Sequence, residues 1–174
     1  MKEKIIRWSV IGFIFTSAAG TLLHFLFDWT NESPIAAPFS SVNESTWEHM
    51  KLLFIALFAF AIIQSFFFKE RADFWCIKLR GILLGITLIP VIFYVYNGAI
   101  GKSPDWLNIT IFFISALAVY IYEAKIFLKK ELPCESQILP LTLLCIIALF
   151  FTVFTFFTPE IEIFKDPLTG MYGI

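Results

Sequence analysis

Five long apolar runs constrain this chain more than any other feature of its sequence. They cover residues 8–27, 52–68, 81–97, 106–122 and 138–157. A helix of about 20 residues spans the hydrocarbon core of a bilayer, which is roughly 30 Å thick. In lipid, backbone N–H and C=O groups must be paired within the spanning structure, and the runs do not show the alternation of barrel strands. Each run therefore predicts a transmembrane helix.

The whole chain is predicted to be one domain, an all-α polytopic membrane helix bundle with five transmembrane helices. We expect helices at about residues 8–27, 46–68, 76–97, 104–128 and 138–157, followed by a tail at 158–174. Hydrophobic residues make up 59% of the chain and charged residues 16%, outside the usual range of soluble domains. The first run is too long for the h-region of a cleaved signal, so we expect it to be retained.

The distribution of basic residues predicts a cytoplasmic N-terminus and an extracytoplasmic C-terminus. Ten of them fall on the side of the N-terminus, namely Lys2, Lys4, Arg7, Lys69, Arg71, Lys78, Arg80, Lys125, Lys129 and Lys130. Three fall on the other side, namely Lys51, Lys102 and Lys165. We expect a multipass protein of the cell membrane with lipid as its partner. The net charge of −1 and the lack of a basic stripe argue against a nucleic-acid partner.

Polar residues from separate segments are expected to gather at the outer end of this bundle. The two histidines, His24 and His49, both fall near that boundary. Ionisable residues close to a membrane span suggest a functional site. The residues expected to line a polar pocket are His24, Asp28, Asn43, Glu44, Glu48, His49 and Lys51, with Tyr172 closing it from above. Asn97, at the end of the third run, is a further candidate for the lining.

The segment at residues 42–51, VNESTWEHMK, also has a purely structural interpretation. Ser45 and Glu48 have the spacing of a capping box, in which a hydroxyl and a carboxylate pair with free amides at a helix start. Asn43 can supply an additional cap. This interpretation leaves out Glu44, and it leaves out His24 and Asp28, which have i,i+4 spacing on one helix face. Both interpretations stay open at this point.

Two kinds of chemistry suit the expected cluster. His24, His49 and Glu44 offer nitrogen and oxygen ligands for a divalent metal cofactor such as Zn²⁺. Alternatively, an imidazole beside a carboxylate is a proton-transfer pair, because the carboxylate fixes the ring's tautomer. The sequence lacks HExxH or a comparable metal motif. A metal is therefore only one of the interpretations.

Three further expectations concern the tail, the cysteines and one acidic residue. The tail carries too many large apolar residues for a disordered segment, so it is expected to fold back across the outer mouth, its terminal carboxylate pairing with Lys51 or Lys102. The alternative is a tail that lies in the membrane interface.

Cys76, Cys134 and Cys145 lack CxxC spacing and are expected to be free thiols. Glu123 is expected to lie among Lys125 and Lys129.

Three segments, at residues 20–25, 42–51 and 164–174, carry a resemblance to known proteins. They read GTLLHF, VNESTWEHMK and FKDPLTGMYGI. Together they resemble an uncharacterised family of small bacterial five-span integral membrane proteins. The resemblance implies a bacterial inner-membrane protein whose three outer segments act as one unit. It implies no activity, substrate or catalytic residue.

Three functions fit these observations. The first is binding or transport of a small polar or cationic ligand, since eight acidic residues are expected outside, namely Asp28, Glu32, Glu44, Glu48, Asp105, Glu160, Glu162 and Asp166. The second is a membrane-embedded enzyme, metal-dependent or not, that acts on a lipid or lipid-linked substrate, with Glu44 or Glu48 as general base. The third is a non-catalytic subunit or assembly factor of a membrane complex.

Overall fold

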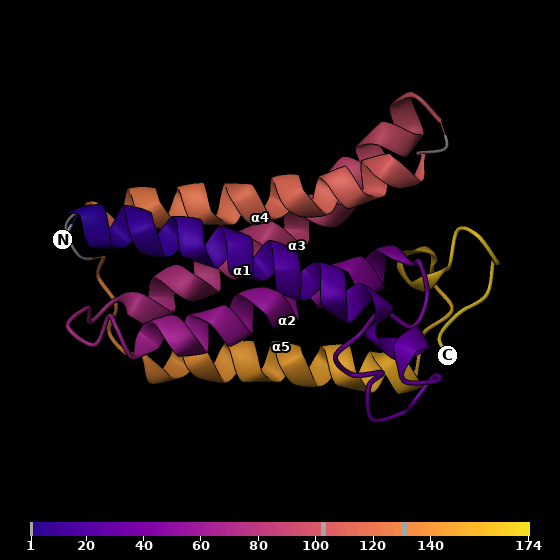
Figure 1. Cartoon of the computed structure of the whole chain (residues 1–174), viewed down its shortest axis with the longest axis horizontal. Coiled ribbons are helices and arrows are strands. Elements are labelled where there is room, and N and C mark those ends of the chain that lie inside the picture. The colour runs from indigo at the N-terminus through magenta and orange to yellow at the C-terminus, as the bar shows by residue number, and fades with distance from the viewer. Residues whose placement is uncertain (1, 102–103, 130–131) are drawn as a thin grey trace.

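The protein folds into a bundle of long helices (Figure 1). The computed structural model describes residues 2–101, 104–129 and 132–174. Its elements are α1 (Lys2–Trp29), α2 (Thr46–Ser65), α3 (Phe74–Ala99), α4 (Asp105–Phe127), α5 (Ile138–Phe156) and the short 3-10 helix η1 (Glu162–Phe164). Five helices are long and apolar enough to cross a membrane, and within the described residues none of the named elements is a strand. The prediction of an all-α fold with five helices able to span a membrane is confirmed.

The ends of the first two helices differ from the ends of their apolar runs. α1 begins at Lys2 and has 28 residues, about 42 Å at 1.5 Å per residue, so its first turns carry the basic N-terminal side chains. α2 begins directly after its cap Ser45 and ends at Ser65, where Phe66 to Phe68 turn the chain. Hydropathy alone does not mark these ends. α1 continues through charged residues at its start, and α2 ends before its apolar run does.

The connection between α1 and α2 and the C-terminal tail lie at the same end of the bundle, opposite the N-terminus (Figure 1). We call this the tail end. α1 and α4 run side by side near the N-terminus and diverge towards the tail end (Figure 1). Lys102 and Lys130, which entered the count of basic residues, lie outside the described residues.

Two glycines of α1 allow close contact with α4. A methyl group added to Gly12 would collide with the ring of Tyr120, and one added to Gly20 would collide with the ring of Phe112. Between them, the hydroxyls of Thr16 and Tyr120 share a hydrogen bond of 2.7 Å. Small residues let membrane helices approach closely, and an interhelical hydrogen bond adds to this packing. The α1–α4 contact therefore includes Gly12, Thr16 and Gly20 of α1.

A buried ion pair joins α3 and α4 near the other end of the bundle. Lys78 Nζ lies 2.6 Å from Glu123 Oε2, and both side chains are buried. The rings of Phe74 and Tyr120 lie within 6 Å of the ammonium. The expectation that Glu123 lies among Lys125 and Lys129 is wrong. Its partner, Lys78, lies on the neighbouring helix α3. Residue spacing within α4 gives no information about that contact.

The expectation of three free thiols is wrong for two of the cysteines. Cys76, in the first turns of α3, forms a disulfide with Cys134, which precedes α5. Cys145 is free. The bonded residues are 58 positions apart in sequence, and they meet because α3 packs against α5. Their spacing carries no signal of this contact.

Candidate functional site

A cavity of about 370 Å³ lies at the tail end of the bundle. Four helices and two other segments contribute to its wall. The lining residues are Gly20, Thr21, His24 and Phe25 of α1, Glu44, His49 and Leu52 at the start of α2, Phe93 and Asn97 of α3, Asn108, Ile109, Phe112 and Phe113 of α4, and Pro167 and Leu168 of the tail. This volume falls within the range of small-molecule sites, roughly 300–1,000 Å³.

Most of the cavity wall is apolar, and its ionisable groups gather on one side. Glu44 Oε1 lies 3.4 Å from His24 Nε2, and Glu44 Oε2 lies 3.7 Å from His49 Nε2. The two imidazole rings are 5.9 Å apart, measured between centroids. The exposed fractions are 39% for the Glu44 side chain, 27% for His24 and 14% for His49. We call His24, Glu44 and His49 the acidic corner.

The orientation of the His49 ring is fixed by the helix that carries it. His49 Nδ1 lies 2.9 Å from the carbonyl oxygen of Ser45. A carbonyl oxygen only accepts, so Nδ1 carries the hydrogen and donates it. In the neutral ring, Nε2 then presents a lone pair to the cavity on the side of Glu44. The acidic corner thus offers a carboxylate and an imidazole lone pair, both of which accept hydrogen bonds.

Capping contacts at the start of α2 hold Glu44 in place. The Ser45 hydroxyl accepts a hydrogen bond of 3.4 Å from the Glu48 amide, which makes Ser45 the N-cap of α2. The Ser45 amide donates to Asn43 Oδ1 at 2.9 Å. Glu44 therefore lies between two residues whose side chains are engaged with the backbone. Ser45 and Asn43 thus make the capping contacts that the structural interpretation expected, and Glu44 lies in the cavity wall.

Glu48 and Lys51 form a separate, buried network that does not line the cavity. Lys51 Nζ lies 2.6 Å from Glu48 Oε2, 2.9 Å from the carbonyl oxygen of Ala37 and 2.8 Å from Thr155 Oγ1. Glu48 Oε2 also accepts from the Val42 amide at 3.0 Å. The three partners of Lys51 Nζ match the three N–H groups of an ammonium. The sequence prediction that both residues line the pocket is not borne out by this placement.

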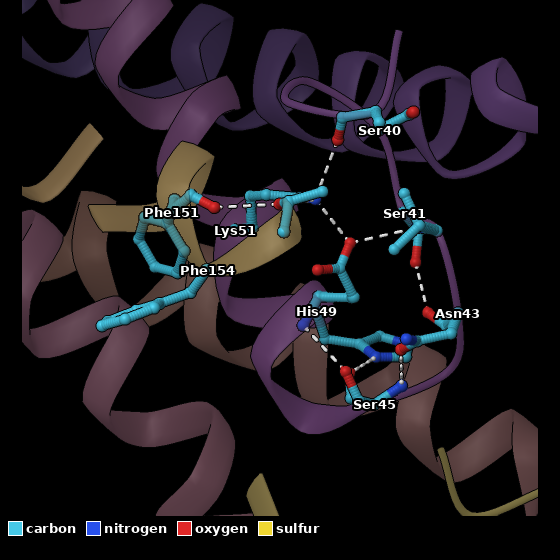
Figure 2. Close-up of polar contacts among 12 residues, drawn as sticks. Ser40, Ser41, Asn43, Ser45, His49, Lys51, Phe151 and Phe154 are labelled. Atoms are coloured by element: carbon cyan, nitrogen blue, oxygen red, sulfur yellow. Dashed lines mark hydrogen bonds and ion pairs between the residues drawn. The ribbon is translucent and has the colours of Figure 1, made fainter. Parts of the chain in front are cut away.

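The Lys51 network joins three parts of the chain. In Figure 2, Lys51 lies between the connection that carries Ser40 and Ser41 and the helix that carries Phe151 and Phe154. Removing two charges from water is costly unless geometry and hydrogen bonds compensate. The contacts of Glu48 and Lys51 provide that compensation. They fix the α1–α2 connection against α2 and α5, which positions the acidic corner.

The tail folds back onto the bundle, as expected, but different residues make the contacts. Phe164 packs between Trp47 and Phe154, with ring centroids 4.5 and 5.8 Å away. Asn43 Nδ2 donates to the carbonyl oxygen of Gly173 at 3.0 Å. The expected partner of the terminal carboxylate, Lys51, is engaged by Glu48 instead. The alternative partner, Lys102, lies outside the described residues.

Pro167 and Leu168, rather than Tyr172, bring the tail to the cavity. Asp166 holds this turn, since its Oδ1 accepts from the Leu168 amide at 2.8 Å. Tyr172 is half-buried and forms an isolated antiparallel bridge with Lys165. Because bridging residues lie side by side, Tyr172 stabilises the turn while the turn's tip reaches the cavity.

Asp28 does not join the acidic corner. Its side chain is exposed, and it is not part of the cavity lining. A helix rises 1.5 Å per residue, so Asp28 lies about 6 Å further along α1 than His24. Asn97 and Asn108 do line the cavity. Both are polar residues near the ends of apolar runs, which is a feature that the sequence shows. The apolar residues of the lining cannot be told from other apolar residues of the spans by sequence alone.

Within residues 2–101, 104–129 and 132–174, no group of three or more His, Cys, Asp and Glu side chains is arranged to hold a metal ion. The distances of 3.4 and 3.7 Å in the acidic corner separate carboxylate oxygens from imidazole nitrogens, which carry a charge only when the ring is protonated. The corner can bind a cation or an N–H donor directly, and it can accept a proton.

Comparison with known proteins gives a family and no function. Neither a curated protein nor a solved structure matches the chain. The family of unknown function DUF6512 matches it over residues 1–174. The protein belongs to this family.

Proposed function

We propose that this protein resides in the cell membrane with its N-terminus in the cytoplasm, and that its tail-end cavity binds an amine. The excess of basic residues at the N-terminal end supports this orientation. The tail end then faces outwards, at the level of the lipid headgroups. The acidic corner supports the choice of ligand.

The observation that carries the proposal is the carboxylate of Glu44, which faces a cavity whose described lining contains no Lys or Arg and lies 3.7 Å from His49 Nε2. Glu44 Oε2 accepts only, and the neutral His49 ring turns its lone pair towards it, because Nδ1 donates to Ser45. A ligand with several N–H groups and a positive charge satisfies both. A primary ammonium has these properties. Hydrogen bonds to charged groups contribute about 1.5–3 kcal/mol, more than neutral ones.

Charge at the rest of the cavity wall agrees with a cationic ligand. Among the described residues that line it, none is Lys or Arg. The buried ammonium of Lys51, on the helix that carries His49, is neutralised by Glu48. An anionic ligand would therefore meet Glu44 without a compensating cation, which disfavours its binding.

The test is equilibrium binding of n-butylamine, with n-butanol as the neutral comparison, to purified protein in detergent. We expect calorimetry to show binding of the amine only. Glu44→Gln keeps the shape and removes the charge, and it should weaken binding by about ten- to hundredfold. Glu160→Gln removes an exposed charge from the tail and should leave binding unchanged. Equal affinities of wild type and Glu44→Gln would refute the amine site.

A second candidate is an enzyme that acts on a lipid or lipid-linked substrate. The observation in its favour is the carboxylate of Glu44 between two imidazoles, since such a group can accept a proton from a bound hydroxyl or water. Glu48 is unsuited to this role because Lys51 engages it. Turnover of membrane lipids by reconstituted wild type, lost in Glu44→Gln and His49→Gln while the amine still binds, would favour this candidate.

A further inference from the structure

We propose that the amine belongs to a membrane lipid, which reaches the cavity sideways from the bilayer through an opening between α1 and α4. The ligand class is a lipid with a primary-amine headgroup, such as phosphatidylethanolamine. This inference rests on the proposed amine site and adds the source of the amine and its route. Three observations support it.

The first observation is that the cavity lining reaches the surface of the bundle that faces lipid. Phe25 of α1 and Ile109 of α4 both line the cavity, yet 43% and 58% of their surfaces are exposed. Thr21 of α1 is also exposed. In a membrane-spanning bundle, exposed residues of the spans meet acyl chains. These three residues therefore form a rim between cavity and lipid.

The second observation is the divergence of the two helices that bear this rim. Gly20 of α1 packs against Phe112 of α4. The two helices separate towards the tail end (Figure 1). His24 lies one turn beyond Gly20, so the acidic corner is on the open side of the contact. A headgroup can enter there without parting the helices deeper in the membrane.

The third observation is that the cavity has one polar and one apolar side. Leu52, Phe93 and Phe113 line it together with the acidic corner. A small water-soluble amine would use only the corner and leave these apolar walls in contact with water, which is unfavourable. A lipid places its headgroup at Glu44 and its upper acyl chains against the apolar walls. The rest of its chains extends between α1 and α4 into the bilayer.

The acceptors of the corner distinguish between headgroups. A primary ammonium has three N–H donors, whereas the quaternary ammonium of choline lipids has none. Phosphatidylglycerol brings an anion and no cation, so it meets the carboxylate of Glu44 without compensation. The expected order of retention is therefore phosphatidylethanolamine first, then phosphatidylcholine, with phosphatidylglycerol last.

The experiment is native mass spectrometry of the full-length protein released from bilayers that contain equal parts of these three lipids. We expect wild type to retain phosphatidylethanolamine about tenfold over each of the others, a preference of about 1.4 kcal/mol. Glu44→Gln should lose the preference. Thr21→Trp and Ile109→Trp, which narrow the rim at exposed positions, should lose it as well. Leu149→Trp, at an exposed position of α5 outside the cavity lining, is the matched control and should retain it.

Binding of n-butylamine to the same variants separates this inference from the amine site. If butylamine binds in a Glu44-dependent way but no lipid is enriched, or if both rim variants keep the lipid, the lipid route is refuted and the amine site stands. If neither amine nor lipid depends on Glu44, both are refuted. Loss of the lipid in both rim variants, with the lipid kept in Leu149→Trp, supports entry from the bilayer.

Discussion

Lys51 Nζ and Glu48 Oε2 lie 2.6 Å apart in the interior of the bundle, where 0% and 3% of their side chains are exposed. The adjacent Glu44 and His49 face the cavity instead. One short segment thus supplies a buried ion pair and two residues of the acidic corner. Substitutions in it should affect stability and binding separately.

Breaking the buried pair should destabilise the fold. Lys51→Met leaves the Glu48 carboxylate buried without its cation, and we expect a loss of about 3–5 kcal/mol in the free energy of unfolding. The double substitution Glu48→Gln with Lys51→Met removes both charges and should recover part of that loss. Denaturant unfolding in mixed micelles measures both variants. Equal stability of Lys51→Met and wild type would contradict the structural role.

Glu44→Gln should leave stability nearly unchanged. Glu44 is 39% exposed and its imidazole neighbours lie at 3.4 Å or more, so we expect a change within about 0.5 kcal/mol. The same unfolding assay applies, with Glu48→Gln as the buried comparison. A loss as large as that of Glu48→Gln would show that Glu44 supports the fold rather than a ligand.

Asn43→Asp should loosen the tail selectively. Aspartate keeps the oxygen that accepts from the Ser45 amide but removes the donor to the Gly173 carbonyl. We expect faster hydrogen exchange at residues 165–174, including the Asp166 amide, which bonds to the Met171 carbonyl. Exchange in α2 serves as the internal control, because its cap is retained. Unchanged exchange in the tail would contradict the role of Asn43 in holding it.

Asp73 should make stability fall at acidic pH. Burial alone would raise the pKa of Asp73, but hydrogen bonds from Arg71 and from the Leu132 amide, with the charge of Arg71, outweigh it and lower the pKa below the ordinary 3.8. A carboxyl whose pKa is lower in the folded state stabilises the fold above its unfolded pKa. That contribution is lost as the pH falls through the folded value.

Comparing wild type with Asp73→Asn between pH 7 and pH 2 tests this expectation. The asparagine variant should be less stable at neutral pH, and the gap between the two proteins should narrow below pH 3.8. A gap that stays constant over this range would show that the Asp73 carboxylate contributes nothing through its charge.

The disulfide provides a test of orientation. If the N-terminal end is cytoplasmic, as proposed, Cys76 and Cys134 should be reduced in cells and should bond only after oxidation. Cells quenched with a membrane-permeant thiol reagent, then denatured and analysed by mass, should show three modified cysteines per chain. Purified protein left in air should show one, Cys145. A disulfide already present in the quenched cells would support the opposite orientation.

The helices could be predicted from the sequence because hydropathy is a local property, and each run by itself is long enough to span a bilayer. The acidic corner was partly predictable, since His24, Glu44 and His49 sit at the ends of their runs. The distinction between Glu44 and Glu48 was not. It depends on Ala37 and Thr155, which come from distant parts of the chain and surround Lys51.

The contact between Gly20 and Phe112 forms part of the cavity wall. The aromatic ring occupies the place where a side chain at position 20 would be, and it also forms part of the cavity wall. A larger residue at position 20 must push the ring aside, and the free space beside the ring is the cavity itself. The lack of a side chain at position 20 thus leaves room for the ring in the wall of a chamber that four helices line.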